Sequence, residues 1–474
     1  MLGEIADRMT RGVETAATTV SEAFFEPALR IGVTGLSRSG KTVFITSLVA
    51  NLMNRGRMPQ LTAAGEGRVL AAFLQPQPDN TVARFAYEDH LAALTGPAPF
   101  WPDGTRSVSE LRLSLRVREG GLLAGMTAGL LGPKTIHIDI VDYPGEWLLD
   151  LALLDKSYAD WSEETLARLP KRPGGAAFLE ALDGIDPKAP LDEPAMRGLA
   201  DAFTTSLQDA RAAGFSDCTP GRFLLPGDLA GAPVLSFAPL PDVRGARRGT
   251  LGGECARRFE AYKNEVVKPF FRDHFARIDR QIVLADVLGA VAAGPAALED
   301  LRRTLAEVLA VFRPGRNAFL SQLLLGRRVE KILFAATKAD HIHHLQHPRL
   351  TALTEALLRE ARDRADFRGA TTAAMSLAAL RCTTEETREH GGRQLDMVRG
   401  RRAEDGRSAA FHPGDLPQDP ARLLAPARNG EDAWAEQAYK VLEFAPTPLD
   451  LAPGEGPPHI RLDRAAQFLI GDRL

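Results

Sequence analysis

The sequence predicts an α/β fold: a mostly parallel β-sheet flanked by helices, with an inserted α-helical domain. Three strand signals support this prediction. An apolar strand within residues 30–47 ends in a glycine-bounded turn and a helix start, an alternating strand ends on Asp142, and a buried strand at 331–336 ends in TKAD. Residues 147–280 instead show helical patterns broken by proline and glycine. Polar motifs at the strand ends place a site at the carboxyl edge of the sheet.

The first segment, residues 1–29, is expected to be a helix. Apolar residues recur there at helical spacing, from Ile5 to Phe24. We interpret it as a helix packed on the sheet, and the alternative is reversible contact with a membrane surface. Acidic residues oppose Arg8 and Arg11, so the alternative has only weak support. The segment also lacks the apolar stretch of a secretory signal.

The turn after the first strand has the composition of a phosphate-binding loop. Gly35, Gly40, Lys41 and Thr42 fit the spacing G-x-x-x-x-G-K-[ST]. The glycines allow close approach to phosphate oxygens, and backbone N–H groups point inward at the start of the helix expected over 41–54. Lys41 would contact the β- and γ-phosphates, and the Thr42 hydroxyl would bind Mg²⁺. A structural glycine turn is the alternative. The predicted phosphate-contacting residues are Gly35, Leu36, Ser37, Arg38, Ser39, Gly40, Lys41, Thr42 and Val43.

A second motif follows further along the chain. Residues 55–102 are expected to be a helical stretch with loops, and residues 111–117 an alternating strand. The next strand ends in Asp142-Tyr143-Pro144-Gly145, which has the pattern D-x-x-G. Asp142 would hold Mg²⁺ through its water shell, and the Gly145 N–H would meet a γ-phosphate. The pattern alone is weak, but it follows a phosphate loop and ends a strand.

The third motif, TKAD, predicts recognition of a guanine base. Thr337, Lys338 and Asp340 have the pattern [NT]-K-x-D. The Asp340 carboxylate can accept hydrogen bonds from guanine N1–H and the exocyclic amine, and the Lys338 stem can lie over the base. Thr337 stands where asparagine is commoner and would tie this loop to the phosphate loop. A charged loop after a strand is the alternative.

Composition excludes several function classes. The net charge of −3 argues against binding nucleic acid by bulk electrostatics. The apolar runs are too short to span a bilayer, so a cytoplasmic protein is expected. Four histidines (His341, His343, His344 and His347) resemble metal ligands but lack a cysteine or carboxylate framework, which disfavours a metal site. A disulfide framework or zinc site is also not expected from the three widely spaced cysteines, Cys218, Cys255 and Cys382.

The three motifs together resemble the GTPase class of P-loop proteins, and the whole chain resembles the YcjX-like family of bacterial P-loop NTPases. The resemblance is carried by RIGVTGLSRSGKTVFITSLVANL, FWPDGTRSVSELRL, IHIDIVDYPGEW, FAATKADHI and HIRLDRAAQFLIGDRL. It implies a GTPase-like domain with a helical insertion, and a poorly defined cellular role that is sometimes linked to stress. The family is often labelled ATPase.

The chain departs from the GTPase pattern after D-x-x-G. Small GTPases usually carry glutamine there to orient the attacking water, and here Glu146 holds the position. Glu146 would act as a general base, or hydrolysis would be slow. Our candidate for the first-switch threonine, a catalytic and Mg²⁺-binding residue, is Thr105, with a turn threonine as the alternative. Arg106 is an exposed charge or an arginine finger in cis. Cys382 and Thr383 are the candidates for a base-contacting loop.

The expected segments are an N-terminal helix (1–29), a nucleotide-binding domain in two parts (30–146 and 281–390), an α-helical insertion (147–280) and a loop-rich closing segment (391–474). The leading hypothesis is a GTPase that requires Mg²⁺ and hydrolyses GTP to GDP and phosphate. One alternative is an ATPase in which TKAD is incidental. Another is a non-hydrolysing scaffold gated by nucleotide, whose helical insertion binds a protein partner.

Overall fold

A computed structural model of the chain describes residues 28–36, 38–104, 107–118, 132–311, 329–363, 370–435 and 438–474. Most of the helix predicted over 1–29 lies outside these ranges, and its last two residues begin strand β1 instead. Ser37, Thr105 and Arg106 also lie outside the described residues. None of the described helices is long and apolar enough to cross a membrane.

The centre of the described chain is an eight-stranded sheet in the order β2-β4-β5-β1-β6-β7-β8, with β3 paired to β4. Strands β5, β1, β6, β7 and β8 run parallel, whereas β4 is antiparallel to both β5 and β2. The predicted α/β class is therefore confirmed. The strands are β1 (Ala28–Gly35), β2 (Val69–Gln75), β3 (Ala83–Arg84), β4 (Ser109–Val117), β5 (Lys134–Asp142), β6 (Arg280–Ala285), β7 (Lys331–Ala336) and β8 (Thr371–Ser376).

Helices cover both faces of this sheet, so apolar residues of its inner strands are buried on both faces. On β6, Ile282 and Leu284 pack in the core that α2 and α18 share, whereas Val283 packs in the core of the opposite face. The helices outside the insertion are α2 (Lys41–Asn54), α3 (Thr62–Gly65), α4 (Tyr87–Thr95), α13 (Val287–Ala293), α14 (Pro295–Val311), α16 (His347–Asp363), α17 (Ala421–Asn429) and α18 (Leu462–Ile470).

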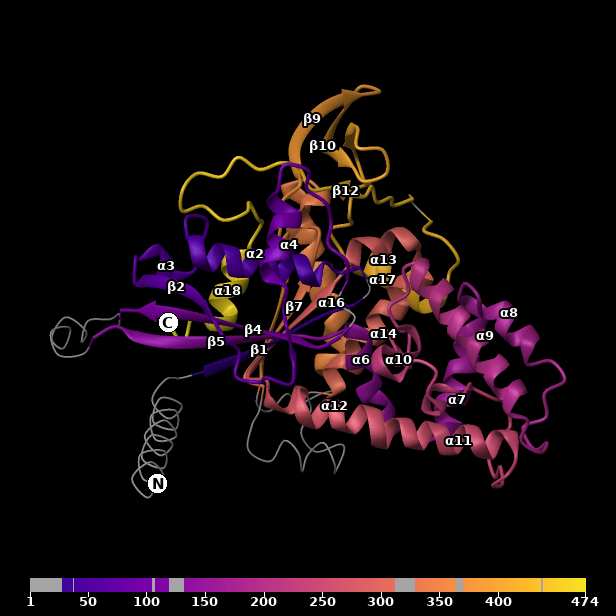
Figure 1. Cartoon of the computed structure of the whole chain (residues 1–474). Coiled ribbons are helices and arrows are strands. Elements are labelled where there is room, and N and C mark those ends of the chain that lie inside the picture. The colour runs from indigo at the N-terminus through magenta and orange to yellow at the C-terminus, as the bar shows by residue number, and fades with distance from the viewer. Residues whose placement is uncertain are drawn as a thin grey trace, which may run out of the picture.

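A helical segment separates β5 from β6 and projects from one side of the sheet (Figure 1). Its centre is aromatic, and Trp161 stacks on Phe259 with ring centroids 5.1 Å apart while meeting Phe203 and Phe237 edge-on. Its helices are α6 (Gly145–Leu149), α7 (Tyr158–Arg168), α8 (Gly175–Ala181), α9 (Glu193–Ala212), α10 (Gly221–Leu224), α11 (Leu251–Ala261) and α12 (Lys268–Asp273), with a π-helix (Tyr262–Val267) between the last two.

Two parts of the fold differ from the sequence prediction. Strand β2 lies within the stretch expected to be helical, because its sequence VLAAFLQ is an apolar run without clear periodicity that pairing with β4 settles as a strand. A second, smaller sheet begins just before the segment expected to be rich in loops and continues into it, and it is seen at the top of Figure 1. Its strands are β9 (Thr383–His390), β10 (Arg393–Arg402), β11 (Ser408–Phe411) and β12 (Phe444–Ala445).

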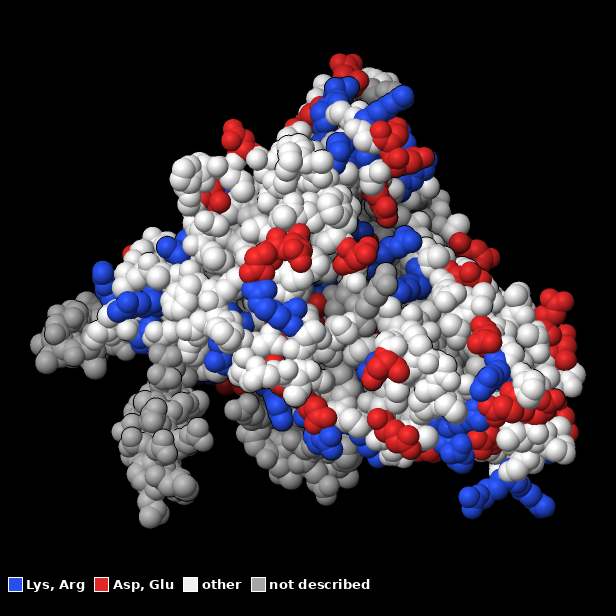
Figure 2. All heavy atoms as spheres, in the orientation of Figure 1, with Lys and Arg blue, Asp and Glu red and all other residues white. Residues whose placement is uncertain are grey.

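Charged side chains of both signs are interspersed on the face shown in Figure 2. Lys and Arg alternate with Asp and Glu over the small sheet and the helical segment, and neither sign forms a continuous patch on that face. Such a surface offers no single-sign field for steering a polyanion.

Candidate functional site

A cavity of about 580 Å³ lies at the carboxyl ends of β1, β5 and β7. The three sequence motifs meet there, although they are far apart along the chain. The residues expected at the site that line the cavity are Gly35, Leu36, Arg38, Ser39, Gly40, Lys41, Thr42, Val43, Gly145, Glu146, Thr337, Lys338 and Asp340.

The loop between β1 and α2 forms the floor of this cavity. The Leu36 N–H donates to the Leu284 carbonyl at the end of β6, and the Ser39 N–H donates back to the Leu36 carbonyl. Gly40 caps α2 in the left-handed region, with φ of 75°, and a Cβ at Gly35 would lie 2.0 Å from Ser39 Oγ. Gly40 therefore has a backbone conformation that favours glycine, and the lack of a Cβ at Gly35 leaves room for the Ser39 hydroxyl. The start of α2 borders the cavity, as anion binding requires.

Lys41 joins the loop to the end of β5. Its Nζ donates to the Tyr143 carbonyl at 2.7 Å and lies 2.8 Å from Asp142 Oδ1. Both charged side chains are buried, with 9% of Lys41 and 2% of Asp142 exposed. The parallel register that places Val33 beside Asp142 brings the two motifs together. The Lys41 ammonium is therefore paired with Asp142, the aspartate of the D-x-x-G motif.

Gly145 packs directly on the phosphate loop. A Cβ at this position would lie 2.0 Å from the Gly35 carbonyl oxygen, so only glycine fits this approach. The next side chain, Glu146, is buried at the cavity wall, and its Oε1 lies 3.0 Å from Nη2 of Arg211. Arg211 belongs to the last turn of α9, in the helical segment.

The TKAD residues close the opposite side of the cavity. Lys338 adopts a left-handed backbone, and its Nζ lies 2.5 Å from Asp286 Oδ2. Asp340 Oδ2 accepts a hydrogen bond of 2.9 Å from the Cys382 N–H, while Oδ1 lies 3.2 Å from His341 Nδ1. Burial alone would raise the pKa of Asp340, but the neighbouring His341 and the Cys382 N–H bring it below its ordinary value. The lowered pKa favours the ionised form of the Asp340 carboxylate.

Residues 29–474 match the model of the YcjX-like family, DUF463. The chain belongs to this family. A relative from Escherichia coli strain K12, called Ras-like GTPase YcjX, is 40% identical over 459 residues, which cover 94% of this chain and 96% of the relative. A relative of the same name from Shewanella oneidensis is 36% identical over 475 residues, which cover 94% of each chain. The family resemblance seen in the sequence is confirmed, and the fold is that of a P-loop NTPase.

In this YcjX-like chain, the contacts of Thr337, Cys382 and Thr383 differ from those expected from the sequence. Thr337 directly follows β7, and among the described residues its hydrogen bonds run to the end of β6: its N–H and Oγ1 donate to the Ala285 carbonyl at 3.0 and 3.3 Å. Cys382 and Thr383 are absent from the cavity lining. Both donate hydrogen bonds to Asp340 instead, the Cys382 N–H to its carboxylate and the Thr383 hydroxyl to its backbone carbonyl. Strand β8 ends at Ser376, and the loop that follows it lines the cavity through Ala378, Ala379 and Leu380.

The cavity of this YcjX-like protein is also lined by residues that the sequence analysis did not predict. The loop after β8 contributes small apolar residues, and the small sheet contributes Phe444, whose carbonyl accepts a hydrogen bond of 2.8 Å from Trp101 Nε1. For the loop after β8, the sequence offers only one signal, a short alanine-rich stretch that follows a strand. The lining residues outside the prediction are Trp101, Pro102, Gly104, Pro144, Arg211, His341, Ala378, Ala379, Leu380, Glu443 and Phe444.

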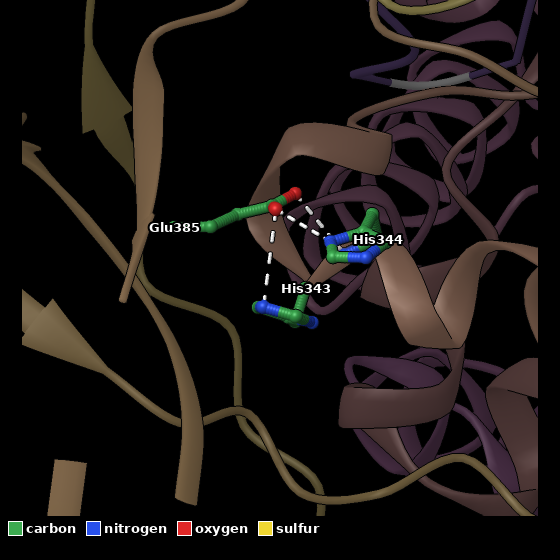
Figure 3. A group of neighbouring side chains, drawn as sticks. All are labelled: His343, His344 and Glu385. Carbon is green, nitrogen blue, oxygen red and sulfur yellow. Dashed lines mark hydrogen bonds and ion pairs between the residues drawn. The ribbon is translucent and has the colours of Figure 1, made fainter. Parts of the chain in front are cut away.

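The histidines that follow TKAD have a carboxylate partner after all. Glu385, from β9, points between His343 and His344 (Figure 3), with Oε2 lying 3.8 Å from His343 Nε2 and 2.6 Å from His344 Nδ1. The argument that these histidines lack a carboxylate was therefore wrong. His343 Nδ1 accepts a 3.4 Å hydrogen bond from the Leu345 N–H, and its other ring nitrogen, Nε2, faces Glu385. We interpret the group as a polar contact that joins the loop after TKAD to β9.

Proposed function

We propose that this YcjX-like protein is a Mg²⁺-dependent GTPase that hydrolyses GTP to GDP and phosphate. The observation that carries the proposal is the meeting of the phosphate loop, D-x-x-G and TKAD around one cavity. The curated relatives named Ras-like GTPase support it. A cavity of about 580 Å³ is within the ordinary size of a small-molecule site.

In this proposal the loop of residues 35–43 binds the phosphates through its backbone N–H groups, and Lys41 neutralises the β- and γ-phosphates. A nucleotide draws the ammonium away from Asp142, which then becomes available to the metal. Thr42 and Asp142 supply hard oxygen donors of the kind that Mg²⁺ prefers, and Thr105 is the proposed third donor. Bound Mg²⁺ would neutralise charge that develops on the phosphate oxygens.

In the proposed hydrolysis step, Gly145 and Glu146 have separate roles. The Gly145 N–H, held against the phosphate loop, donates to the γ-phosphate, and the Glu146 carboxylate accepts a proton from the attacking water. On the opposite side, Asp340 reads the guanine edge and Lys338 lies along the base. The backbone of Ala378–Leu380 is the proposed base-contacting loop, in place of Cys382 and Thr383, because it lines the cavity.

The helical segment is proposed to respond to the γ-phosphate and to bind a protein partner. Gly145 and Glu146 begin α6, whose Trp147 and Leu148 pack in the same core as the helical segment. Movement of D-x-x-G towards a phosphate therefore displaces the first helix of the segment. Order–disorder and hinge responses to a γ-phosphate are established devices of nucleotide switches.

One observation favours an ATPase as the second candidate. Both oxygens of the Asp340 carboxylate already have partners within the protein, at Cys382 and His341. A guanine base has to compete with at least one of them, or share the carboxylate with it. If the base never does so, TKAD is incidental and adenine fits equally well.

A competition titration separates the two candidates. GTP, ATP and xanthosine triphosphate compete for wild type, for Asp340→Asn, and for the control Asp405→Asn in the turn between β10 and β11. We expect wild type and the control to prefer GTP, and Asp340→Asn to weaken GTP and favour xanthosine triphosphate, whose 2-oxo group accepts from the new amide. Preference for ATP in wild type, or an unchanged ranking in the variant, gives the lead to the ATPase. Single-turnover hydrolysis tests the non-hydrolysing scaffold, which releases no phosphate.

A further inference from the structure

The helical segment reaches the cavity through one described side chain. Arg211 is the only residue between 147 and 277 among the described residues that line the cavity. It stands in the last turn of α9, beside the D-x-x-G motif, and its Nη2 lies 3.0 Å from Glu146 Oε1. This position is next to the proposed binding place of the γ-phosphate, because Gly145 directly precedes Glu146.

The backbone beneath Arg211 is firmly held. The apolar face of α9 packs in the aromatic core through Phe203 and Leu207, and Ala210 is buried against Phe215. The Gly214 N–H donates to the Arg211 carbonyl at 3.1 Å, which closes the end of the helix. A rigid base of this kind positions a long side chain without fixing its tip.

The side chain itself is able to change partner. Arg211 is 36% exposed and Glu146 8%, so water reaches this ion pair from the arginine side. A γ-phosphate carries more negative charge than one carboxylate, and a guanidinium binds phosphate oxygens through two parallel N–H donors. Among the described residues that line the cavity, the other Lys and Arg side chains have partners elsewhere: Lys41 pairs with Asp142, Lys338 pairs with Asp286, and Arg38 lies 4.0 Å from Glu443.

We propose that Arg211 is a catalytic residue supplied in cis by the helical segment, an inference that rests on the proposed GTPase function. Without nucleotide, Arg211 pairs with Glu146. When GTP binds, the guanidinium transfers to the γ-phosphate oxygens and releases the Glu146 carboxylate for the water.

The reaction then balances within the site. The water oxygen forms a bond to the γ-phosphorus while the bond from that phosphorus to the β–γ bridging oxygen breaks, and the electron pair leaves with GDP. A water proton passes to Glu146 and from there to the released phosphate. Arg211 stabilises the charge on the transferred group, and a guanidinium in that role is worth about 10³–10⁵-fold in kcat in other GTPases.

Arg211→Ala and Arg211→Lys test this assignment against Arg197→Ala. Arg197 is a matched control because it lies on the same helix, outside the cavity lining, in an exposed pair with Glu193. Three quantities are measured for each protein: GDP affinity, the single-turnover rate of GTP hydrolysis, and the gain in GDP affinity when Mg²⁺ and aluminium fluoride, a mimic of the transferring phosphoryl group, are added.

We expect Arg211→Ala to bind GDP within about threefold of wild type, to hydrolyse GTP at least about 100-fold more slowly, and to lose the gain from aluminium fluoride. Arg211→Lys should recover part of the rate, and added guanidinium ion should restore part of it to Arg211→Ala. Arg197→Ala should match wild type throughout.

The opposite results are equally clear. If Arg211 only restrains Glu146, Arg211→Ala hydrolyses GTP as fast as wild type or faster and keeps its response to aluminium fluoride, which overturns the inference and leaves the proposed GTPase intact. If wild type itself releases no phosphate from GTP, the proposed function fails, and the catalytic role of Arg211 fails with it.

Discussion

Replacing Lys41 with methionine should destabilise the nucleotide-free protein, because the Asp142 carboxylate then remains buried without this cation. The two groups are 2.8 Å apart, and neither side chain is more than 9% exposed. Removing one member of a buried ion pair costs about 3–5 kcal/mol, whereas neutralising both members costs much less than the sum. We therefore expect Lys41→Met to lower the free energy of unfolding by about 3 kcal/mol. The double variant with Asp142→Asn should show a coupling energy of at least about 1 kcal/mol.

Urea unfolding in EDTA, after removal of nucleotide, measures the four free energies of this cycle. The surface pair of Arg84, at the end of β3, and Glu88, in the first turn of α4, provides the control, because both side chains are about half exposed and such exposed pairs contribute about 0.2–1 kcal/mol. A coupling energy for Lys41 and Asp142 no larger than that of the control would refute the reasoning, since the buried pair would then store no electrostatic energy.

The same contact sets a limit on nucleotide binding. Lys41 has to exchange Asp142 for phosphate oxygens, and a hydrogen bond to a charged group contributes about 1.5–3 kcal/mol. Nucleotide affinity should therefore fall at least tenfold in Lys41→Met. Calorimetric titration of the folded variant checks this, and an unchanged affinity contradicts the phosphate-loop assignment.

Three further predictions concern the chemical step, its coupling to the helices, and pH. Glu146→Ala should slow single-turnover hydrolysis by about 10²–10⁴-fold at nearly constant affinity, and an unchanged rate would mean that another group positions the water. Hydrogen exchange over residues 148–169 should differ between GDP and a GTP analogue, and identical protection excludes the coupling. Burial raises the pKa of Asp150 to about 7, so the stability it contributes is present below its ordinary pKa of 3.8 and lost as pH rises through 7. Asp150→Asn should remove that loss, and parallel unfolding free energies for both proteins between pH 4 and 8 would contradict it.

The local parts of the site could be predicted from the sequence. The phosphate loop is one continuous stretch whose glycines each have a steric reason, and Asp142 and Asp340 follow apolar strands whose carboxyl ends meet at one edge. The fold class followed from the same strands and is confirmed. The roles of Lys41, Glu146 and Asp340 remain predictions.

The missing parts come from contacts between distant segments. Arg211 and Phe444 reach the cavity from the helical segment and the small sheet, and nothing in their local sequence distinguishes them from an ordinary surface arginine or core phenylalanine. The small sheet was missed because the sequence TTEETREH of β9 is polar on both faces and gives no apolar alternation. Glu385, on that strand, became a partner for His343 only through this pairing of remote segments.

The place of the small sheet and α18 in the chain has a consequence for how the protein is made. Phe444, which lines the same cavity as Lys41, and Leu469, which packs in the core beside the central strands, are translated long after Lys41. At about 5–20 residues per second, the interval between Lys41 and Phe444 is about 20–80 s. Throughout that interval the phosphate loop exists without its far wall, and one face of the sheet lacks its last helix. Nucleotide therefore has its complete cavity only after Phe444 has been translated.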